Sequence, residues 1–253
     1  MTLTELIQYL VKKFSFIACK NHSEENYSAD IPTSLIEVYK KVKPYTMTSP
    51  ERVFALCEAV KYIHEKNIEG DVVECGVWKG GSMMAVAEIL LSSGDSSRNL
   101  YLFDTFEGMT PPTEKDVDIS GVPAETLLEQ SDKIKEESVW CCASLEMVQS
   151  AVNSIGYPSE KIHFVKGMVE QTIPFSAPDK IALLRLDTDW YESTKHEMEH
   201  LFPRLVKGGV LIIDDYGHWQ GARKGVDEYL EKNNIKILLN RIDYTGRIAV
   251  NVE

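Results

Sequence analysis

From residue 50 onward, short and almost wholly apolar segments alternate with longer segments whose apolar residues recur at helical spacing. A strand that is buried on both faces has this continuous apolar character, because helices cover each side of its sheet. The alternation of such strands with helices is typical of α/β folds in which most strands are parallel. The chain is therefore predicted to form a mostly parallel sheet with helices on both faces.

Local signals give the limits of the predicted elements. The first helix of this pattern is expected to start at Pro50, which is favoured in a first turn, with Ser49 as its N-cap. The strands are predicted at residues 71–76, 99–104, 161–167, 180–187 and 209–215, and the helices between them at 82–92, 144–156, 192–206 and 221–233. With 253 residues, 43% of them hydrophobic, the chain is long enough for one large domain with a sizeable core.

The C-terminal end departs from this alternation. The segments "IKILLNRI" and "RIAVNV" flank the short turn "DYTG", which predicts a β-hairpin at the edge of the sheet. An antiparallel ending of this kind is unusual in dinucleotide dehydrogenases. It is typical of the methyltransferase version of the doubly wound fold.

Two segments lie outside the predicted core. Residues 1–48 are expected to form a helical arm or lid ahead of a main domain at 49–253, since their first part has apolar residues at helical spacing and lysines between them. Residues 108–140 form a polar insert rich in proline and acidic residues. Long connections inside compact domains are often functional, so the insert is expected to act as a lid over the acceptor, with a disordered surface loop as the alternative.

Charge and cysteine content narrow the class of protein. The chain has 27 basic and 39 acidic residues and a net charge of −12, so nucleic acids and anionic membranes are not expected partners. The apolar runs are shorter than the roughly 18 residues of a membrane-spanning helix. The five cysteines, at positions 19, 57, 75, 141 and 142, show no metal-binding spacing and are expected to be reduced, which fits a cytoplasmic protein. A redox role for the adjacent Cys141 and Cys142 is the alternative.

Acidic side chains stand where the predicted strands end, and ligands of open α/β sheets bind beyond these ends. Any one of these acids could be a helix cap, but several of them at the same edge of a sheet predict a binding site. They are Glu74 after the first strand, Asp104 after the second, Asp187 and Asp189 after the fourth, and Asp214 and Asp215 after the fifth.

The turn after the first strand, "DVVECGVWKGGS" at residues 71–82, distinguishes between cofactors. A dinucleotide fingerprint reads GxGxxG, whereas the glycines here are at 76, 80 and 81 and follow the acid Glu74. A carboxylate at that position would repel a pyrophosphate and suits the ammonium and sulfonium groups of S-adenosylmethionine. The carboxylate of this cofactor would lie near the amides that begin the helix at Gly81 and Ser82. Asp104 is expected to accept hydrogen bonds from the ribose hydroxyls.

Three acids predict a metal site. Asp187, Asp214 and Asp215 offer hard oxygen ligands, which favour Mg²⁺ over zinc. With no lysine or arginine expected beside them, such a cluster would repel itself unless a cation were bound. Arg185 is near in sequence, and a structural pair between Arg185 and Asp187 is the alternative interpretation.

A metal ion beside this cofactor suggests one chemistry. A hydroxyl bound to Mg²⁺ becomes more acidic, a carboxylate removes its proton, and the oxygen attacks the cofactor methyl in line with the departing sulfur. Asp187 is the first choice for metal ligand and base, and Asp189 is the alternative base or a support for Asp187. His196 and His218 are weaker candidates, since isolated histidines are more often plain polar residues.

These motifs together resemble the macrocin O-methyltransferase (TylF-type) family, whose enzymes use S-adenosylmethionine to methylate sugar hydroxyls on macrolides and other natural products. The matching stretches, which lie between about residues 44 and 230, are "PYTMTSPERVFALCEAVKYI", "GDVVECGVWKGGS", "LFDTFEGM", "VKGMVEQTIP", "LRLDTDWYEST" and "GGVLIIDDYGHWQGARKGVDEYL". The resemblance implies the Rossmann-like class I methyltransferase fold, with a mostly parallel seven-stranded sheet and a C-terminal antiparallel hairpin.

The resemblance also implies a magnesium site at Asp187, Asp214 and Asp215, with Asp187 as the base, and a lid over a small-molecule glycoside acceptor. A homo-oligomer is expected. The residues predicted to bind the cofactor are Thr48, Glu74, Gly76, Gly80, Gly81, Ser82, Asp104, Thr105, Gly167, Met168 and Asp187.

The sequence also leaves alternative functions to consider. A catechol-type O-methyltransferase would use the same cofactor and metal but needs two adjacent phenolic oxygens, and a non-sugar hydroxyl or carboxyl acceptor from a polyketide or peptide pathway is a further alternative. A nicotinamide dehydrogenase is disfavoured by the glycine spacing and the hairpin tail. A cofactor-binding module without catalysis is disfavoured by the set of acids.

Overall fold

A computed structural model describes residues 27–133 and 138–252, and the chain divides into two compact units, Met1–Ile36 and Glu37–Glu253. Residues 37–48 belong to the same compact unit as the sheet, and the division into an arm at 1–48 and a main domain at 49–253 stays a prediction. The predicted amphipathic helix at the N-terminus and Cys19 lie outside the described residues.

The order of the elements follows the predicted alternation. Helices and strands have these bounds: α2 Thr33–Val42, η1 Lys43–Tyr45, α3 Pro50–Glu65, β1 Asp71–Cys75, α4 Gly81–Ser92, β2 Leu100–Asp104, α5 Ala124–Glu129, α6 Leu145–Asn153, η2 Ser159–Lys161, β3 Ile162–Lys166, α7 Val169–Thr172, β4 Ile181–Leu186, α8 Tyr191–His200, η3 Phe202–Arg204, β5 Leu205–Ile213, α9 Gln220–Lys232, β6 Asn240–Arg241 and β7 Arg247–Val250. The main difference is the predicted helix 192–206, which ends at His200 and continues as η3 around Pro203.

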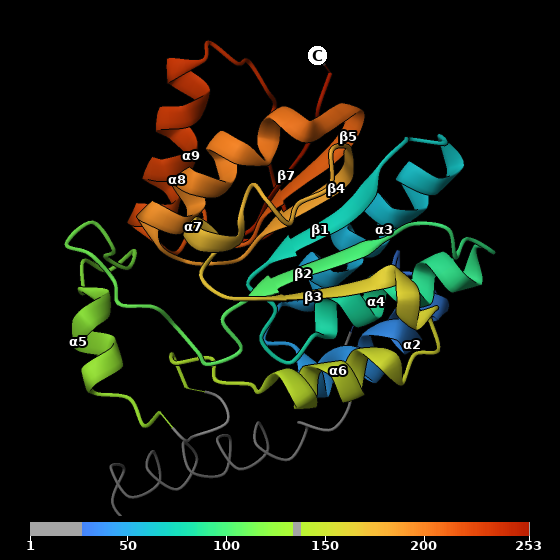
Figure 1. The fold of residues 1–253 in the computed structure, drawn as a ribbon, viewed down its shortest axis with the longest axis horizontal. Coiled ribbons are helices and arrows are strands. Elements are labelled where there is room, and N and C mark those ends of the chain that lie inside the picture. Colours follow the sequence, from blue (N-terminus) through green and yellow to red (C-terminus); the bar gives the residue numbers. More distant parts are fainter. Residues whose placement is uncertain (1–26, 134–137, 253) are drawn as a thin grey trace, which may run out of the picture. The chain divides into compact units, whose positions relative to one another are not determined.

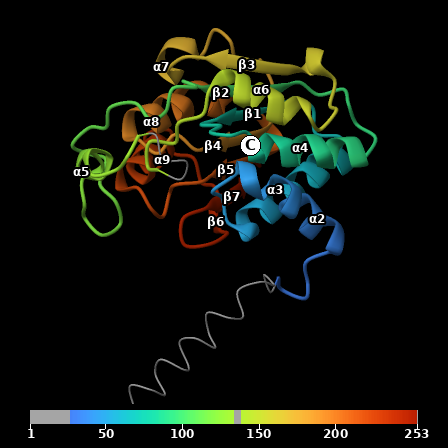
Figure 2. The same cartoon turned by 90° about the horizontal axis from the view of Figure 1, so that it is seen from below.

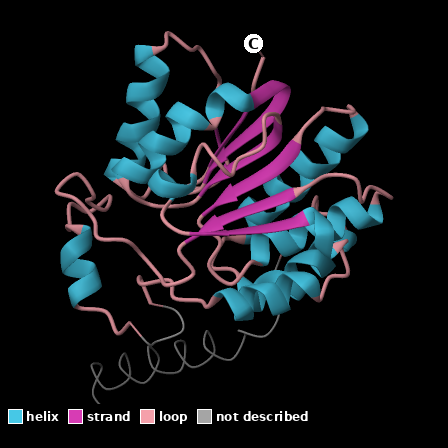
Figure 3. Ribbon diagram, in the orientation of Figure 1, coloured by secondary structure: helices cyan, strands magenta, loops and turns pink. Residues whose placement is uncertain are grey.

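Within the described residues, seven strands form one sheet in the order β3-β2-β1-β4-β5-β7-β6 (Figures 1 and 3). β1 pairs in parallel with β2 and β4, and β3 and β5 extend the parallel part on either side. β7 runs antiparallel to both β5 and β6. The predicted class I methyltransferase fold, including the antiparallel hairpin at one edge, is confirmed.

Helices cover both faces of the sheet (Figures 1 and 2). α3, α4 and α6 lie on one face, and α7, α8 and α9 lie on the other. The start of α3 is as predicted, because the Ser49 side chain accepts a hydrogen bond from the Arg52 backbone N–H. Among the described residues, no helix combines the length and the apolarity needed to cross a bilayer.

Neighbouring side chains of β1 point to different helical layers, because side chains alternate along a strand. Val73 and Cys75 pack into the apolar cluster that includes Met198 of α8. Glu74, between them, faces the opposite layer, where Met83 of α4 is one of its neighbours. A polar residue on β1 is thus buried under α3 and α4.

The described part of the insert is attached to the layer of α8 and α9 through contacts of Asp116 and Thr110. Asp116 is 0% exposed, and its Oδ1 accepts a 2.7 Å hydrogen bond from the backbone N–H of Tyr191, the first residue of α8. The insert thereby caps a helix whose own N-cap residue, Trp190, makes no side-chain cap. The Trp190 indole N–H in turn donates to the carbonyl of Thr110 over 2.9 Å.

Candidate active site

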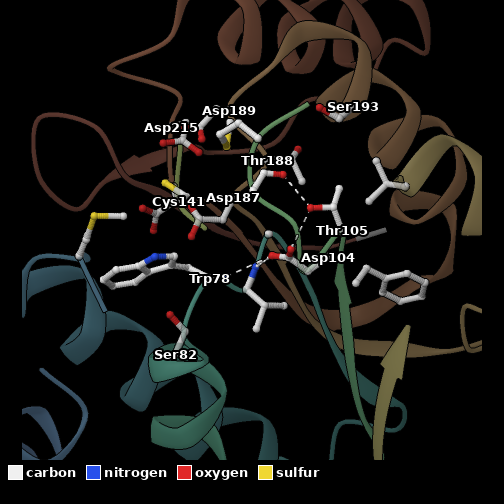
Figure 4. A pocket seen from close by; sticks show the side chains of 18 of the residues that line it. Trp78, Ser82, Asp104, Thr105, Cys141, Asp187, Thr188, Asp189, Ser193 and Asp215 are labelled. Atoms are coloured by element: carbon white, nitrogen blue, oxygen red, sulfur yellow. Dashed lines mark hydrogen bonds between the residues drawn. The ribbon is translucent and has the colours of Figure 1, made fainter. Parts of the chain in front are cut away.

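A cavity of about 220 Å³ opens at the carboxyl ends of β1, β2, β4 and β5, the edge at which ligands of open α/β sheets bind. The predicted site residues that line it are Thr48, Gly76, Ser82, Asp104, Thr105, Gly167, Asp187, Asp189, Asp214 and Asp215. Figure 4 shows Asp187, Asp189 and Asp215 grouped together, with the Cys141 thiol among them. The strand-end acids therefore converge as predicted, with Glu74 as an exception.

Arg185 of β4 binds three of the acids. Its Nη1 donates to Glu74 Oε1 over 2.7 Å and to Asp187 Oδ2 over 2.6 Å, and its Nη2 donates to Asp214 Oδ1 over 2.6 Å. Burial opposes the charge of Arg185, but the three carboxylates hold its pKa well above the ordinary value. Nη2 also donates to the Thr48 hydroxyl, so this predicted cofactor residue belongs to the same network.

A second guanidinium reaches the cluster from α3. Arg52 donates from Nη1 to Asp214 Oδ2 and from Nε to Asp243 Oδ2, the latter over 3.0 Å. Both oxygens of Asp214 are therefore bonded to arginines. The expectation of an acid cluster without a nearby arginine is wrong, and the alternative of a structural pair between Arg185 and Asp187 is present. Repulsion alone therefore does not require a metal ion here.

Glu74 is not placed to meet a cofactor. It is 1% exposed, does not line the cavity, and faces Arg185 under α3 and α4. Burial raises the pKa of Glu74 to about 7, although the charge of Arg185 opposes this. The predicted contact between Glu74 and the cationic groups of the cofactor is corrected: the strand places this side chain inside the protein, where it orients Arg185.

The glycine turn is held by Asp104 at the end of β2. Asp104 Oδ2 accepts hydrogen bonds from the backbone N–H groups of Val77 (2.6 Å) and Trp78 (3.2 Å), and Oδ1 accepts one from Phe106 (2.7 Å). Trp78 has a φ of 48°, a left-handed conformation that a bulky residue rarely adopts without support. The carboxylate thus fixes the shape of the turn, and its predicted contact with the ribose hydroxyls stays a prediction.

The glycines serve close packing more than cofactor contact. Gly76 lines the cavity at a φ of 81°, and a Cβ there would overlap the carbonyl oxygen of Asp187. A Cβ at Gly81 would overlap the backbone of Tyr45. Gly80 and Gly81 do not line the cavity, and neither does Met168, whose side chain is partly exposed to solvent. Contact of these three residues with the cofactor stays a prediction.

The predicted metal ligands do come together. Asp187, Asp214 and Asp215 each offer one carboxylate oxygen, and these oxygens lie within 4.8 Å of one another. Asp215 Oδ2 is buried and has no hydrogen-bond partner among the described residues. An all-carboxylate set with an unpartnered buried oxygen fits a hard divalent cation such as Mg²⁺. The two arginines at Asp214 would then share that carboxylate with the ion.

Asp189 lies beside this set without contacting Arg52 or Arg185, and it too has a positive φ, 65°. Burial and the nearby charge of Asp187 raise the pKa of Asp189 to about 7. Burial and the charge of Asp189 likewise raise the pKa of Asp215. The histidines are elsewhere: neither His196 nor His218 lines the cavity.

Several lining residues were not predicted. Arg52 sits three positions after the Ser49 cap, and Trp78 stands within the quoted glycine stretch, but neither has a spacing that would single it out. The Trp78 indole Nε1 is buried and has no partner among the described residues, so it is a free donor at the cavity wall. Burial raises the pKa of the Cys141 thiol, which keeps it neutral. The described cysteines, Cys57, Cys75, Cys141 and Cys142, form no disulfide with one another.

Comparison with known proteins adds to this geometry. A model of the family described as macrocin-O-methyltransferase (TylF) matches residues 10–249. The chain belongs to the macrocin O-methyltransferase family. This membership and the class I fold make it an S-adenosylmethionine-dependent O-methyltransferase.

Two relatives of this macrocin O-methyltransferase family member come from Streptomyces and Micromonospora. It is 33% identical to an 8-demethyl-8-(2,3-dimethoxy-alpha-L-rhamnosyl)-tetracenomycin-C 4'-O-methyltransferase of Streptomyces olivaceus, over 80% of this chain and 74% of that protein. It is 31% identical to a mycinamicin III 3''-O-methyltransferase of Micromonospora griseorubida, over 80% and 76% of the two chains. Among solved structures, the O-methyltransferase NovP superposes with a TM-score of 0.72 and 28% identity over 83% of each chain.

Proposed function

We propose that this enzyme transfers a methyl group from S-adenosylmethionine to a sugar hydroxyl of a glycosylated natural product, in a reaction that depends on Mg²⁺. The observation that carries the proposal is the meeting of Asp187, Asp214 and Asp215 at the cavity wall, with Asp215 Oδ2 buried and unpartnered. The acceptor class is supported by the two relatives above, whose names place the methyl group on a rhamnosyl 4' oxygen and on a 3'' oxygen.

The cofactor is proposed to occupy the part of the cavity formed by the β1–α4 turn. Gly76 and Trp78 line this part, and Ser82 stands in the first turn of α4. The amides at the start of a helix favour an anionic group, which suits the carboxylate of S-adenosylmethionine. The free indole N–H of Trp78 is a further donor for it. Asp104 shapes this region by holding the turn.

The metal is proposed to be held by Asp187, Asp214 and Asp215. When bound, Mg²⁺ makes a coordinated hydroxyl more acidic at neutral pH. Arg185 keeps the carboxylates of Asp187 and Asp214 in place through bonds of 2.6 Å, so these side chains lose little freedom on binding the ion.

The proton of the acceptor hydroxyl is assigned to a carboxylate at the same wall. Asp187 Oδ2 is taken by Arg185, whereas Asp189 contacts neither arginine and lines the cavity beside Asp187. We therefore prefer Asp189 as the proton acceptor, with Asp187 as the alternative. A homo-oligomer and a cytoplasmic location stay predictions.

The test combines binding with turnover. Calorimetry is expected to show binding of S-adenosylhomocysteine and no binding of NAD. Methyl transfer is then measured with mycinamicin III and with catechol as acceptors, each with Mg²⁺ and with EDTA. We expect activity on a glycoside that EDTA abolishes. Binding of NAD would refute the cofactor, activity in EDTA would refute the metal, and transfer to catechol alone would refute the sugar acceptor.

Variants locate the reaction. Asp215→Asn should lose methyl transfer by about a hundredfold or more while S-adenosylhomocysteine binds within about threefold of the parent affinity, because the lost oxygen faces the metal site. Asp179→Asn, at an exposed position two residues before β4 and outside the cavity, is the matched control and should keep full activity. A fully active Asp215→Asn enzyme would remove this residue from the proposed site.

A further inference from the structure

Glu197 of α8 is a buried acid that the proposed chemistry does not use. It is 0% exposed, and its Oε1 accepts a 2.9 Å hydrogen bond from the Thr188 hydroxyl. Its other oxygen, Oε2, is also buried and has no hydrogen-bond partner among the described residues. A carboxyl group in such a place is costly to the fold unless it is neutral or has a use.

Thr188 links the contact of Glu197 to the candidate active site. It stands between Asp187 and Asp189, the two acids to which the proton transfer is assigned, and it lines the cavity with them. The turn is short, because the Trp190 N–H donates to the Thr188 carbonyl over 2.7 Å and Asp189 has a φ of 65°. A shift of Thr188 would therefore move both acids.

The turn is held from both faces of the sheet. Under α3 and α4, Arg185 donates a 2.6 Å hydrogen bond to the Asp187 carboxylate. On the opposite face, where Cys75 and Met198 pack, Glu197 holds the Thr188 hydroxyl. Arg185 fixes only the acid that precedes Thr188, so the hydrogen bond to Glu197 is the contact that restrains the middle of the turn from the α8 side.

Burial disfavours the charged form of Glu197. Desolvation raises its pKa well above the ordinary value, and the charges of Glu170 and Asp187 raise it further, against the hydrogen bonds from Thr188 and from the Cys75 thiol. In its protonated form, the glutamic acid would add no negative charge to a site whose cavity is already lined by five aspartates. It also has a close isostere in glutamine, whose amide carbonyl can accept the same bond.

We propose that Glu197 is a positioning residue which, through Thr188, fixes the turn that carries Asp187 and Asp189 into the cavity. This inference rests on the proposed roles of these two aspartates. It assigns Glu197 no contact with cofactor, metal or acceptor.

The experiment compares Glu197→Gln, Glu197→Leu and Thr188→Val in the full chain. Thr188→Val removes the same hydrogen bond from its other end, so the test holds even if Glu197→Leu does not fold. Glu199→Leu, on a partly exposed position of the same helix, is the matched control. Hydrogen exchange at the amides of residues 187–190 reports the turn, and calorimetry with S-adenosylhomocysteine reports the cofactor site. Turnover of mycinamicin III reports kcat and KM.

Loss of the hydrogen bond between Thr188 and Glu197 should slow the chemical step. Because displacements of about 1 Å can cost roughly a hundredfold in rate, Glu197→Leu and Thr188→Val should each lower kcat about 10- to 100-fold, with KM and cofactor affinity within about threefold of the parent. Amide exchange in the turn should be about tenfold faster in both. Glu197→Gln should match the parent in every measurement. The double variant with Glu197→Leu and Thr188→Val should lose no more kcat than either single variant, because both changes remove the same hydrogen bond.

The proposal is overturned if Glu197→Gln is as impaired as Glu197→Leu, if the single losses multiply in the double variant, or if Thr188→Val leaves amide exchange unchanged. Failure of the proposed function looks different. If mycinamicin III is not methylated or Mg²⁺ has no effect, the exchange rates and their rescue by glutamine still decide whether Glu197 holds the turn.

Discussion

Replacing Asp104 with asparagine should loosen the turn between β1 and α4 and weaken cofactor binding through it. The carboxylate accepts two short backbone hydrogen bonds, 2.6 Å from Val77 and 2.7 Å from Phe106, and a longer one from Trp78. Asparagine keeps one acceptor oxygen but turns an NH₂ group toward a backbone donor. Hydrogen bonds to a charged group contribute about 1.5–3 kcal/mol each, and a buried donor without a partner costs about 1–3 kcal/mol.

From these values, Asp104→Asn should lower the free energy of unfolding by about 2–4 kcal/mol, measured by urea denaturation. Trp78 would leave its left-handed conformation in part, so the affinity for S-adenosylhomocysteine should fall about 10- to 100-fold by calorimetry. Glu107→Gln, which changes an exposed acid paired with Lys166, is the control and should leave the midpoint of urea unfolding unchanged.

The two roles of Asp104 separate in this assay. If the carboxylate served only the ribose hydroxyls, the variant would bind the cofactor weakly and unfold at the urea concentration of the parent. Unchanged stability would therefore refute the role of Asp104 in holding the turn. Unchanged affinity for S-adenosylhomocysteine would show that cofactor binding does not depend on how Asp104 holds the turn.

Three further changes test the packing around the site. Arg185→Met should destabilise the fold by about 3–5 kcal/mol in thermal or urea unfolding, because it leaves buried carboxylates without their partner; a loss below about 1 kcal/mol would contradict the network. Gly76→Ala should cost more than Gly94→Ala by urea unfolding, since both have positive φ but only Gly76 has a backbone oxygen in the way; equal losses would refute the close approach. For Asp243, burial raises the pKa, but hydrogen bonds and the charge of Arg52 lower it by more, to below the ordinary value of 3.8. The ionised carboxylate therefore stabilises the fold above pH 3.8, and this stabilisation is lost as the pH falls through the pKa of the folded state. Asp243→Asn should therefore lower stability by about 1–3 kcal/mol at neutral pH, with a difference that shrinks below about pH 4; a constant difference would exclude an ionised Asp243 as the cause.

Local sequence signals were enough for the elements and for the acids. The strands are apolar because both of their faces are covered, and the Ser49 cap is a property of four consecutive residues, so both are readable without a structure. Asp187, Asp214 and Asp215 were predicted because strand ends of one sheet share an edge. The family resemblance, from stretches in the same order, is confirmed by the match over residues 10–249.

Contacts that depend on register and packing were beyond the sequence. Glu74 and Arg185 are direct partners across β1 and β4, and only this register shows that one guanidinium reaches three carboxylates. Arg52 joins them because α3 packs over the strand ends, which no motif reveals. Asp104 has the predicted place, but its rotamer, set by the turn's amides, decides what it binds.

The attachment of the insert has a consequence for how its sequence can vary. Asp116 is held by a backbone N–H of α8, which any residue at that position supplies, and the Trp190 indole binds a backbone carbonyl of the insert. Gly108 and Thr110 at the start of the insert reach the cavity, as does Cys141 just after its end, whereas the described residues between Thr110 and Cys141 do not. The insert is therefore fastened through backbone groups and meets the acceptor side of the cavity only near its two ends, so changes of sequence in its described middle part should leave the arginine and carboxylate network intact.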